Sequence, residues 1–163
     1  MISENIINVT HVQVKLRSNY DAFIKNLESN VNELDIKYAK DVATEPKKTE
    51  DYLKSLEGKT GLIIFNVQHH GDLLYMTGKP RKARQYVIGN PLVAIQMTVH
   101  DIRAALYAPL RIVVYEDLNQ QAIVEYDLPS TLCGQFGNEA VFEVAKGLDQ
   151  KLLNAITLVD KTT

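Results

Sequence analysis

The stretch from Ile88 to Asp127 constrains the fold more than any other part of this sequence. It opens with Gly89, a residue that tolerates the positive φ of a sharp turn. Asn90 is a preferred helix N-cap and Pro91 a preferred first helical residue. The residues that follow, up to Val99, are almost all apolar, which predicts a helix that is covered on most of its sides. A turn and a buried helix are therefore expected directly after a strand.

Two β-rich segments complete this stretch. Residues 111–116 and 122–126 are rich in β-branched and aromatic side chains, and the polar residues 117–120 separate them. Such a pattern is typical of a β-hairpin. Glu116 and Glu125 lie near the strand ends, where a carboxylate can reach solvent or a cleft.

A series of short motifs occurs in this part of the chain, namely Ile88-Gly89-Asn90-Pro91, Asp101-Ile102-Arg103-Ala104-Ala105-Leu106, Ala108-Pro109-Leu110-Arg111, Val114-Tyr115-Glu116-Asp117 and Tyr126-Asp127-Leu128-Pro129. The order of these motifs resembles that of the DUF302 family. Upstream, His70 matches the histidine of a D-H pair that the family often has, and His69 replaces the aspartate. The resemblance covers about residues 60–160. It implies an α+β fold and a tendency to form homodimers, and the activity of the family is unassigned.

Hydrophobic periodicity predicts the remaining elements. They are an alternating strand over 10–17, an amphipathic helix from the N-cap Ser18 to about Leu34, an apolar strand over 62–65 at the sheet centre, a short helix over 73–76, a strand over 85–88 and a closing helix over 138–160. Residues 37–59 carry charges of both signs and predict a variable, solvated connector with a short helix from Thr49 to Leu56. His11 belongs to the polar face of the first strand, where an exposed histidine is expected.

Length and composition indicate one soluble domain over residues 1–163. Hydrophobic residues make up 45% of the chain and charged residues 23%, as in ordinary globular domains. A net charge of −2 gives no electrostatic basis for binding nucleic acid or an anionic membrane. The start of the chain lacks the features of a signal peptide, and no apolar run approaches the roughly 20 residues of a membrane span. The lone Cys133 excludes an internal disulfide, and a cytoplasmic location is expected.

The element order predicts an α+β domain. Strands joined partly by a hairpin and partly by helices favour a mostly antiparallel sheet of four or five strands, with helices packed on one face. A second face or an edge of such a sheet stays uncovered, which makes homodimer formation physically reasonable.

One functional hypothesis is an enzyme with His70 and Glu116 as its catalytic acid–base pair. An imidazole that titrates near pH 7 and a carboxylate at a strand end suit proton transfer. Such a pair must face one cavity. The side chains that could orient a substrate or ligand are Asn66, Asn90, Arg103 and Tyr115.

The alternative hypothesis is a non-catalytic dimeric module that holds a small, partly apolar ligand between the sheet and the helix from Asn90 to Val99. A weaker option is phosphate or anion binding by the loop that contains Lys79, Arg81, Lys82 and Arg84. The spacing of histidines, cysteines and carboxylates matches no metal-ligand motif, and no cofactor fingerprint is present, so neither a metal nor a cofactor is expected. Because no nucleophile is evident either, the binding hypothesis is favoured.

Overall fold

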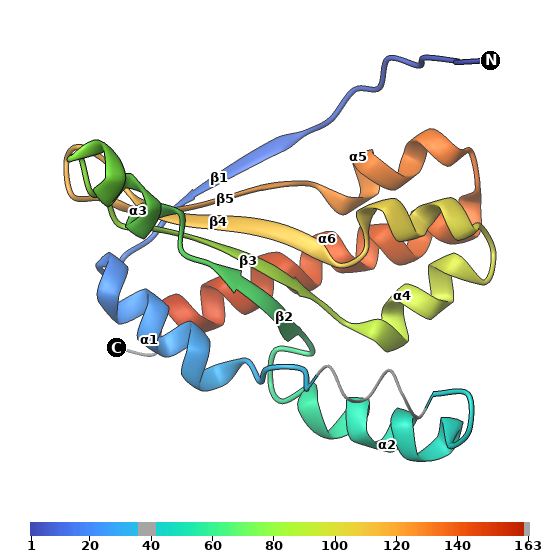
Figure 1. Cartoon of the computed structure of the whole chain (residues 1–163). Coiled ribbons are helices and arrows are strands. Elements are labelled where there is room, and N and C mark those ends of the chain that lie inside the picture. Colours follow the sequence, from blue (N-terminus) through green and yellow to red (C-terminus); the bar gives the residue numbers. More distant parts are fainter. Residues whose placement is uncertain (36–41, 162–163) are drawn as a thin grey trace.

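One antiparallel sheet organises the protein, in a computed structural model that describes residues 1–35 and 42–161. The strand order across the sheet is β1–β5–β4–β3–β2 (Figure 1). The strands are β1 (His11–Lys15), β2 (Ile63–Gln68), β3 (Ala83–Gly89), β4 (Leu110–Glu116) and β5 (Ala122–Asp127). Every pairing between neighbouring strands is antiparallel, so the predicted α+β class is confirmed.

Helices connect or flank these strands. The α-helices are α1 (Tyr20–Asn30), α2 (Pro46–Leu56), α3 (His70–Leu73), α4 (Pro91–Thr98), α5 (Pro129–Cys133) and α6 (Glu139–Asp160). Short 3-10 helices follow α3, α4 and α5, namely η2 (Leu74–Thr77), η3 (Ile102–Tyr107) and η4 (Gly134–Phe136). The closing helix and the β4–β5 hairpin have nearly the predicted bounds. Part of the predicted connector, residues 37–41, lies outside the described residues.

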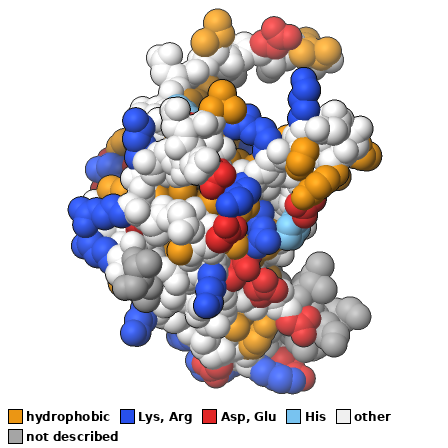
Figure 2. All heavy atoms as spheres, turned by 90° about the vertical axis from the view of Figure 1, so that its left-hand side faces the viewer, with side chains coloured by type: hydrophobic (Ala, Val, Ile, Leu, Met, Phe, Trp, Pro, Cys, Tyr) orange, Lys and Arg blue, Asp and Glu red, His pale blue; other side chains and the backbone are white. Residues whose placement is uncertain are grey.

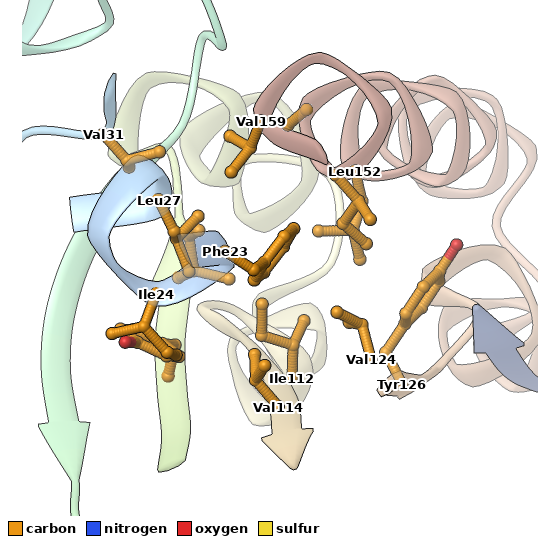
Figure 3. Close-up of a cluster of buried hydrophobic side chains, with 14 of the residues drawn as sticks. Phe23, Ile24, Leu27, Val31, Ile112, Val114, Val124, Tyr126, Leu152 and Val159 are labelled. Carbon is orange, nitrogen blue, oxygen red and sulfur yellow. The ribbon is translucent and has the colours of Figure 1, made fainter. Parts of the chain in front are cut away.

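The main hydrophobic core lies between the sheet and two helices. Figure 3 shows Phe23 and Leu27 of α1 pointing toward Leu152 of α6, above Ile112 and Val124 of the sheet. Each of these five side chains is at most 2% exposed. The apolar stripes of α1 and α6 therefore cover the same face of the sheet, as the helical spacing predicts.

The N-terminus of α1 differs from the prediction by one residue. Its N-cap is Asn19, whose side-chain oxygen accepts a hydrogen bond from the backbone N–H of Ala22 at 2.9 Å. Ser18, the predicted N-cap, instead donates from its hydroxyl to Asp160 at 2.7 Å. The carboxylate of Asp160 also accepts hydrogen bonds from the backbone N–H groups of Arg17 and Ser18, so it ties the end of α6 to the β1–α1 connection.

The predicted central position of the strand at 62–65 is wrong, because β2 is an edge strand. Its apolar side chains are nevertheless buried, with Ile63 and Ile64 at most 1% exposed. Ile64 belongs to the main core between the sheet and α1 and α6, and the chain after α1 runs beside it with a parallel bridge between Glu33 and Ile64. Backbone hydrogen bonds of 2.8 and 2.9 Å join Ile64 to Leu34 and Asn32. This edge of the sheet is thus partly covered by another segment of the same chain.

The helix after Asn90 is also less buried than predicted. Within α4 only Met97 is buried, whereas Ile95 is 56% exposed. Exposed apolar residues continue into the 3-10 helix η3, where Ile102 and Leu106 are each 73% exposed. The reason is that α4 packs against the end of α6 and beside α2 rather than between two layers. One side of this apolar helix consequently faces water.

A second, smaller core holds the helical end of the molecule together. Met97 of α4, Ala104 of η3 and Cys133 of α5 pack against Val141 and Ala145 of α6. Cys133 is 2% exposed, and burial raises the pKa of its thiol to about 11. The predicted role of this cysteine as a small buried residue is confirmed.

Candidate functional site

An open groove of about 810 Å³ lies between α2, α4 and the adjoining ends of β3 and β4. Its walls are mostly apolar: α2 contributes Leu53, α4 contributes Leu92 and Ile95, and β2 contributes Phe65. Leu110, at the start of β4, also lines the groove. The sequence predicts a ligand pocket beside the helix that follows Asn90, and the groove adjoins this helix, α4.

Asn90 holds the two helical walls in place. As the N-cap of α4, its side-chain oxygen accepts a hydrogen bond from the backbone N–H of Leu92 at 2.8 Å. Its amide nitrogen donates to the carboxylate of Glu57 at 2.6 Å and to the carbonyl of Gly61 at 3.0 Å. Because Glu57 directly follows α2, the same side chain connects the end of α2 to the start of α4. Asn90 is 4% exposed, as expected for a polar group with a full set of partners.

Helix α2 is the wall that sequence reasoning underestimated. The expected helix began at Thr49, but α2 begins at Pro46, a favoured residue for the first helical turn. Thr49 and Leu53, four residues apart, are its buried positions. This i, i+4 spacing was a readable signal that one side of the helix packs inward, although charged residues dominate the segment.

A search for similar proteins places the chain in a family. The model of the family described as "Domain of unknown function DUF302" matches residues 38–159. The chain belongs to the DUF302 family. The match begins well before the segment that carries the motif resemblance, so it includes α2. No curated protein matches the chain.

A solved structure agrees with this assignment at the level of the fold. It is described as the crystal structure of an uncharacterized conserved DUF302 protein from Bacillus stearothermophilus. The two chains are 16% identical, the alignment covers 90% of this chain and 95% of the other, and the TM-score is 0.64. At this identity the likeness concerns the arrangement of helices and strands.

In this DUF302 chain, the two predicted catalytic residues have different surroundings. His70 is the exposed first residue of α3, and Glu116 is the last residue of β4. A hollow of about 900 Å³ beside Glu116 is lined by Asp72 among others, but His70 is not one of its described lining residues. The carboxylate of Glu116 lies 3.4 Å from the ammonium of Lys82. His70 and Glu116 do not line the same described hollow, and an acid–base pair formed by these two residues stays a prediction.

The predicted anion-binding loop borders the same hollow, and two of its cations already have acidic partners. The ammonium of Lys82 lies 2.7 Å from a carboxylate oxygen of Asp21, and the guanidinium of Arg84 lies 2.6 Å from one of Glu28. Figure 2 shows this side of the molecule, where basic and acidic side chains alternate over the surface. Lys79 and Arg81, the other two cations, are exposed. Anion binding here remains a prediction, and the local pairing of charges weakens its basis.

The four predicted ligand-binding residues fall on three different surfaces. Asn90 lies in the groove, whereas Asn66 and Tyr115 are on the sheet face opposite to α1 and α6. Arg103, in η3, pairs with Asp101 and stacks over the ring of Phe136 at 5.0 Å. The structure therefore does not bring these four side chains together.

The sheet face opposite to α1 and α6 carries a hydrogen-bonded network that the sequence did not predict. Glu125 accepts from the hydroxyl of Tyr115 at 2.7 Å and from the side-chain amide of Gln13 at 2.6 Å. His11 lies between Glu125 and Asp127, at 3.2 and 2.8 Å. Its hydrogen bond to Asp127, and then the one to Glu125, raise the pKa of His11 above the ordinary value. His11 is exposed, as expected, but not isolated.

Two further findings concern metal binding and membrane insertion. In residues 1–35 and 42–161, no group of three or more His, Cys, Asp or Glu side chains is arranged to hold a metal ion. Among the helices of that same part of the chain, none has the length and hydropathy required to cross a membrane.

Proposed function

We propose that this DUF302 protein binds a small, partly apolar ligand in the groove between α2, α4 and the ends of β3 and β4. The observation that carries the proposal is the groove itself. Its volume of about 810 Å³ falls in the range of roughly 300–1,000 Å³ that is usual for small-molecule sites, and its walls are largely apolar, as such sites are. Asn90 keeps the two helical walls in a fixed relation, which favours a preformed site.

Thermal unfolding with a library of metabolites and lipids tests the proposal. A ligand at about one hundred times its Kd adds about 2.7 kcal/mol to the free energy of unfolding. For a chain of this size, that corresponds to a rise in Tm of about 5–10 °C.

Two alanine-to-phenylalanine variants localise the effect. Ala94 lines the groove and is half-buried, so Ala94→Phe fills the space with a ring. Ala105 is exposed in η3 and lies outside the groove lining, so Ala105→Phe is the matched control. The shift should persist in Ala105→Phe and disappear in Ala94→Phe. A library in which no compound gives this pattern would contradict the proposal.

We also propose that the protein is a homodimer paired through the outer edge of β1. The support is that β1 pairs only with β5 among the described strands, so its other edge is open to a second copy. The N–H of Leu16 donates to β5, and by the alternation of antiparallel pairing the N–H of Lys15 faces the open edge.

The molar mass in solution, measured by light scattering during size-exclusion chromatography, tests the proposed homodimer. The wild type should have twice the 18.4 kDa mass of the chain, and Lys15→Pro, which blocks edge pairing but removes no bond to β5, should be monomeric. A monomeric wild type refutes the dimer. A Lys15→Pro variant that is folded and still dimeric refutes the edge as its interface.

A further inference from the structure

We infer that the groove takes the hydrocarbon chain of a single-chain amphiphile and leaves its polar head group in water at the rim. This inference rests on the ligand-binding function proposed above and specifies the class of ligand. The inference follows from the hydrogen bonds and the ion pair that the polar side chains along the groove already form within the protein.

Gln96 lines the groove as an exposed residue, whereas the buried or half-buried polar side chains of the lining, those of Asn90, Thr49 and Thr98, have hydrogen bonds within the protein. Both N–H groups and the oxygen of the Asn90 amide are engaged by Glu57, Gly61 and Leu92. The hydroxyl of Thr49 donates to the carbonyl of Glu45 at 3.2 Å.

The hydroxyl of Thr98 likewise donates within its own helix, to the carbonyl of Ala94 at 3.1 Å. Among the described residues, no buried side-chain nitrogen or oxygen lacks a partner. A polar ligand that entered this groove would lose hydrogen bonds to water and find few replacements.

Among the described residues that line the groove, the charged side chains belong to α2. Glu50 and Lys54 line the groove there, and they form an ion pair with each other one helical turn apart. Their side chains are 41% and 52% exposed, so both remain in contact with water. A head group at this rim keeps its hydration and needs no charged partner from the protein.

The apolar walls, by contrast, still expose hydrophobic surface to water. Ile95 lines the groove and is 56% exposed, and Phe65 and Leu92 are only half-buried. A hydrocarbon chain that covers these side chains removes apolar surface from water on both partners, which is the main source of affinity available in such a site. The ligand is thus selected by its chain, with little selection by its head group.

Binding of octanoate, decanoate, dodecanoate and the matching primary alcohols, measured below their aggregation concentrations, tests the inference. Each pair of added methylene groups should tighten binding about fifteen-fold, the equivalent of about 0.8 kcal/mol per methylene. Replacing the carboxylate with a hydroxyl should change the affinity by less than about three-fold, because an exposed ion pair contributes little. Ala94→Phe should abolish binding of both series, and Ala105→Phe should not.

Two outcomes overturn the inference. The first is a head-group dependence, in which Lys54→Gln or the change to an alcohol removes binding. The second is a polar metabolite whose binding is lost in Ala94→Phe while neither amphiphile series binds, and that result leaves the proposed ligand-binding function intact. If no compound of either kind binds in a manner sensitive to Ala94→Phe, the inference and the proposed function fail together.

Discussion

His11 and Asp127 lie directly opposite each other on β1 and β5, and Nδ1 of the histidine is 2.8 Å from a carboxylate oxygen of the aspartate. The other ring nitrogen, Nε2, is 3.2 Å from Glu125. Both nitrogens can donate at the same time only when the ring is protonated. The imidazolium form therefore connects the edge strand to its neighbour through two carboxylates.

This arrangement predicts a pH-dependent contribution to stability. Because the pKa of His11 is raised above 6.5, its contribution is fully present below about pH 6.5 and is lost as the pH rises through the raised value. The side chain is 58% exposed, so the contribution should be below about 1 kcal/mol. An NMR titration should show the pKa of His11 falling toward its ordinary value in Asp127→Asn. An unchanged titration in that variant would contradict the role given to Asp127.

Replacing Asn90 should destabilise the protein more than replacing an ordinary cap. Asn90→Ala removes the N-cap of α4 together with the bonds to Glu57 and Gly61, at an expected cost of about 2–3 kcal/mol. Asn19→Ala is the control, because its side-chain oxygen caps α1 by accepting from Ala22 at 2.9 Å; it should cost about 1 kcal/mol. Urea unfolding of both variants measures the difference, and equal losses would show that the bonds to Glu57 and Gly61 contribute nothing.

Gly71 is required by close packing between α3 and the start of β3. A Cβ atom at this position would lie 2.0 Å from the carbonyl oxygen of Arg81 and 2.7 Å from the backbone nitrogen of Ala83. Gly71→Ala should therefore cost about 1–3 kcal/mol. Gly147 lies within α6 with nothing near its Cβ position, so Gly147→Ala should stabilise the protein by about 0.5–1 kcal/mol. Thermal unfolding distinguishes these opposite signs, and a Gly71→Ala variant as stable as the wild type would disprove the close approach.

Two adjacent leucines of α6 should respond differently to truncation. Leu152 is 1% exposed in the main core, whereas Leu153 is 39% exposed. Leu152→Ala should lower the free energy of unfolding by about 2–5 kcal/mol, since it leaves a cavity. Leu153→Ala should lower it by less than about 1 kcal/mol. Comparable losses from the two variants would mean that α6 is rotated relative to the sheet.

The features that sequence predicts well depend on residues close together along the chain. The pair Asn90-Pro91 marks the start of α4 because capping involves only the first helical turn. The hairpin of β4 and β5 is equally local, since five residues, 117–121, connect its strands.

The features that sequence did not predict depend on distant contacts. The edge position of β2 is set by the strand order, and its partial cover involves a bridge from Glu33 to Ile64. The network around His11 depends on the pairing of β1 with β5. The alternation in β1 places His11 on a polar face, but it does not indicate which strand pairs with β1. The candidate groove combines both cases. The start of its α4 wall follows from a local motif, whereas the position of α2 involves distant contacts such as the bond from Asn90 to Glu57.

The burial of Cys133 gives this protein an intrinsic reporter of opening. It is the sole cysteine of the chain, and thiol reagents react with the thiolate, which a pKa of about 11 keeps scarce at neutral pH. In the folded protein Cys133 is buried in the smaller core formed by α4, η3, α5 and α6, so modification requires that this core opens. The rate at which Cys133 is alkylated therefore reports the rate at which this core opens, and no added probe is needed. A cysteine introduced on the surface can be labelled selectively for distance measurements.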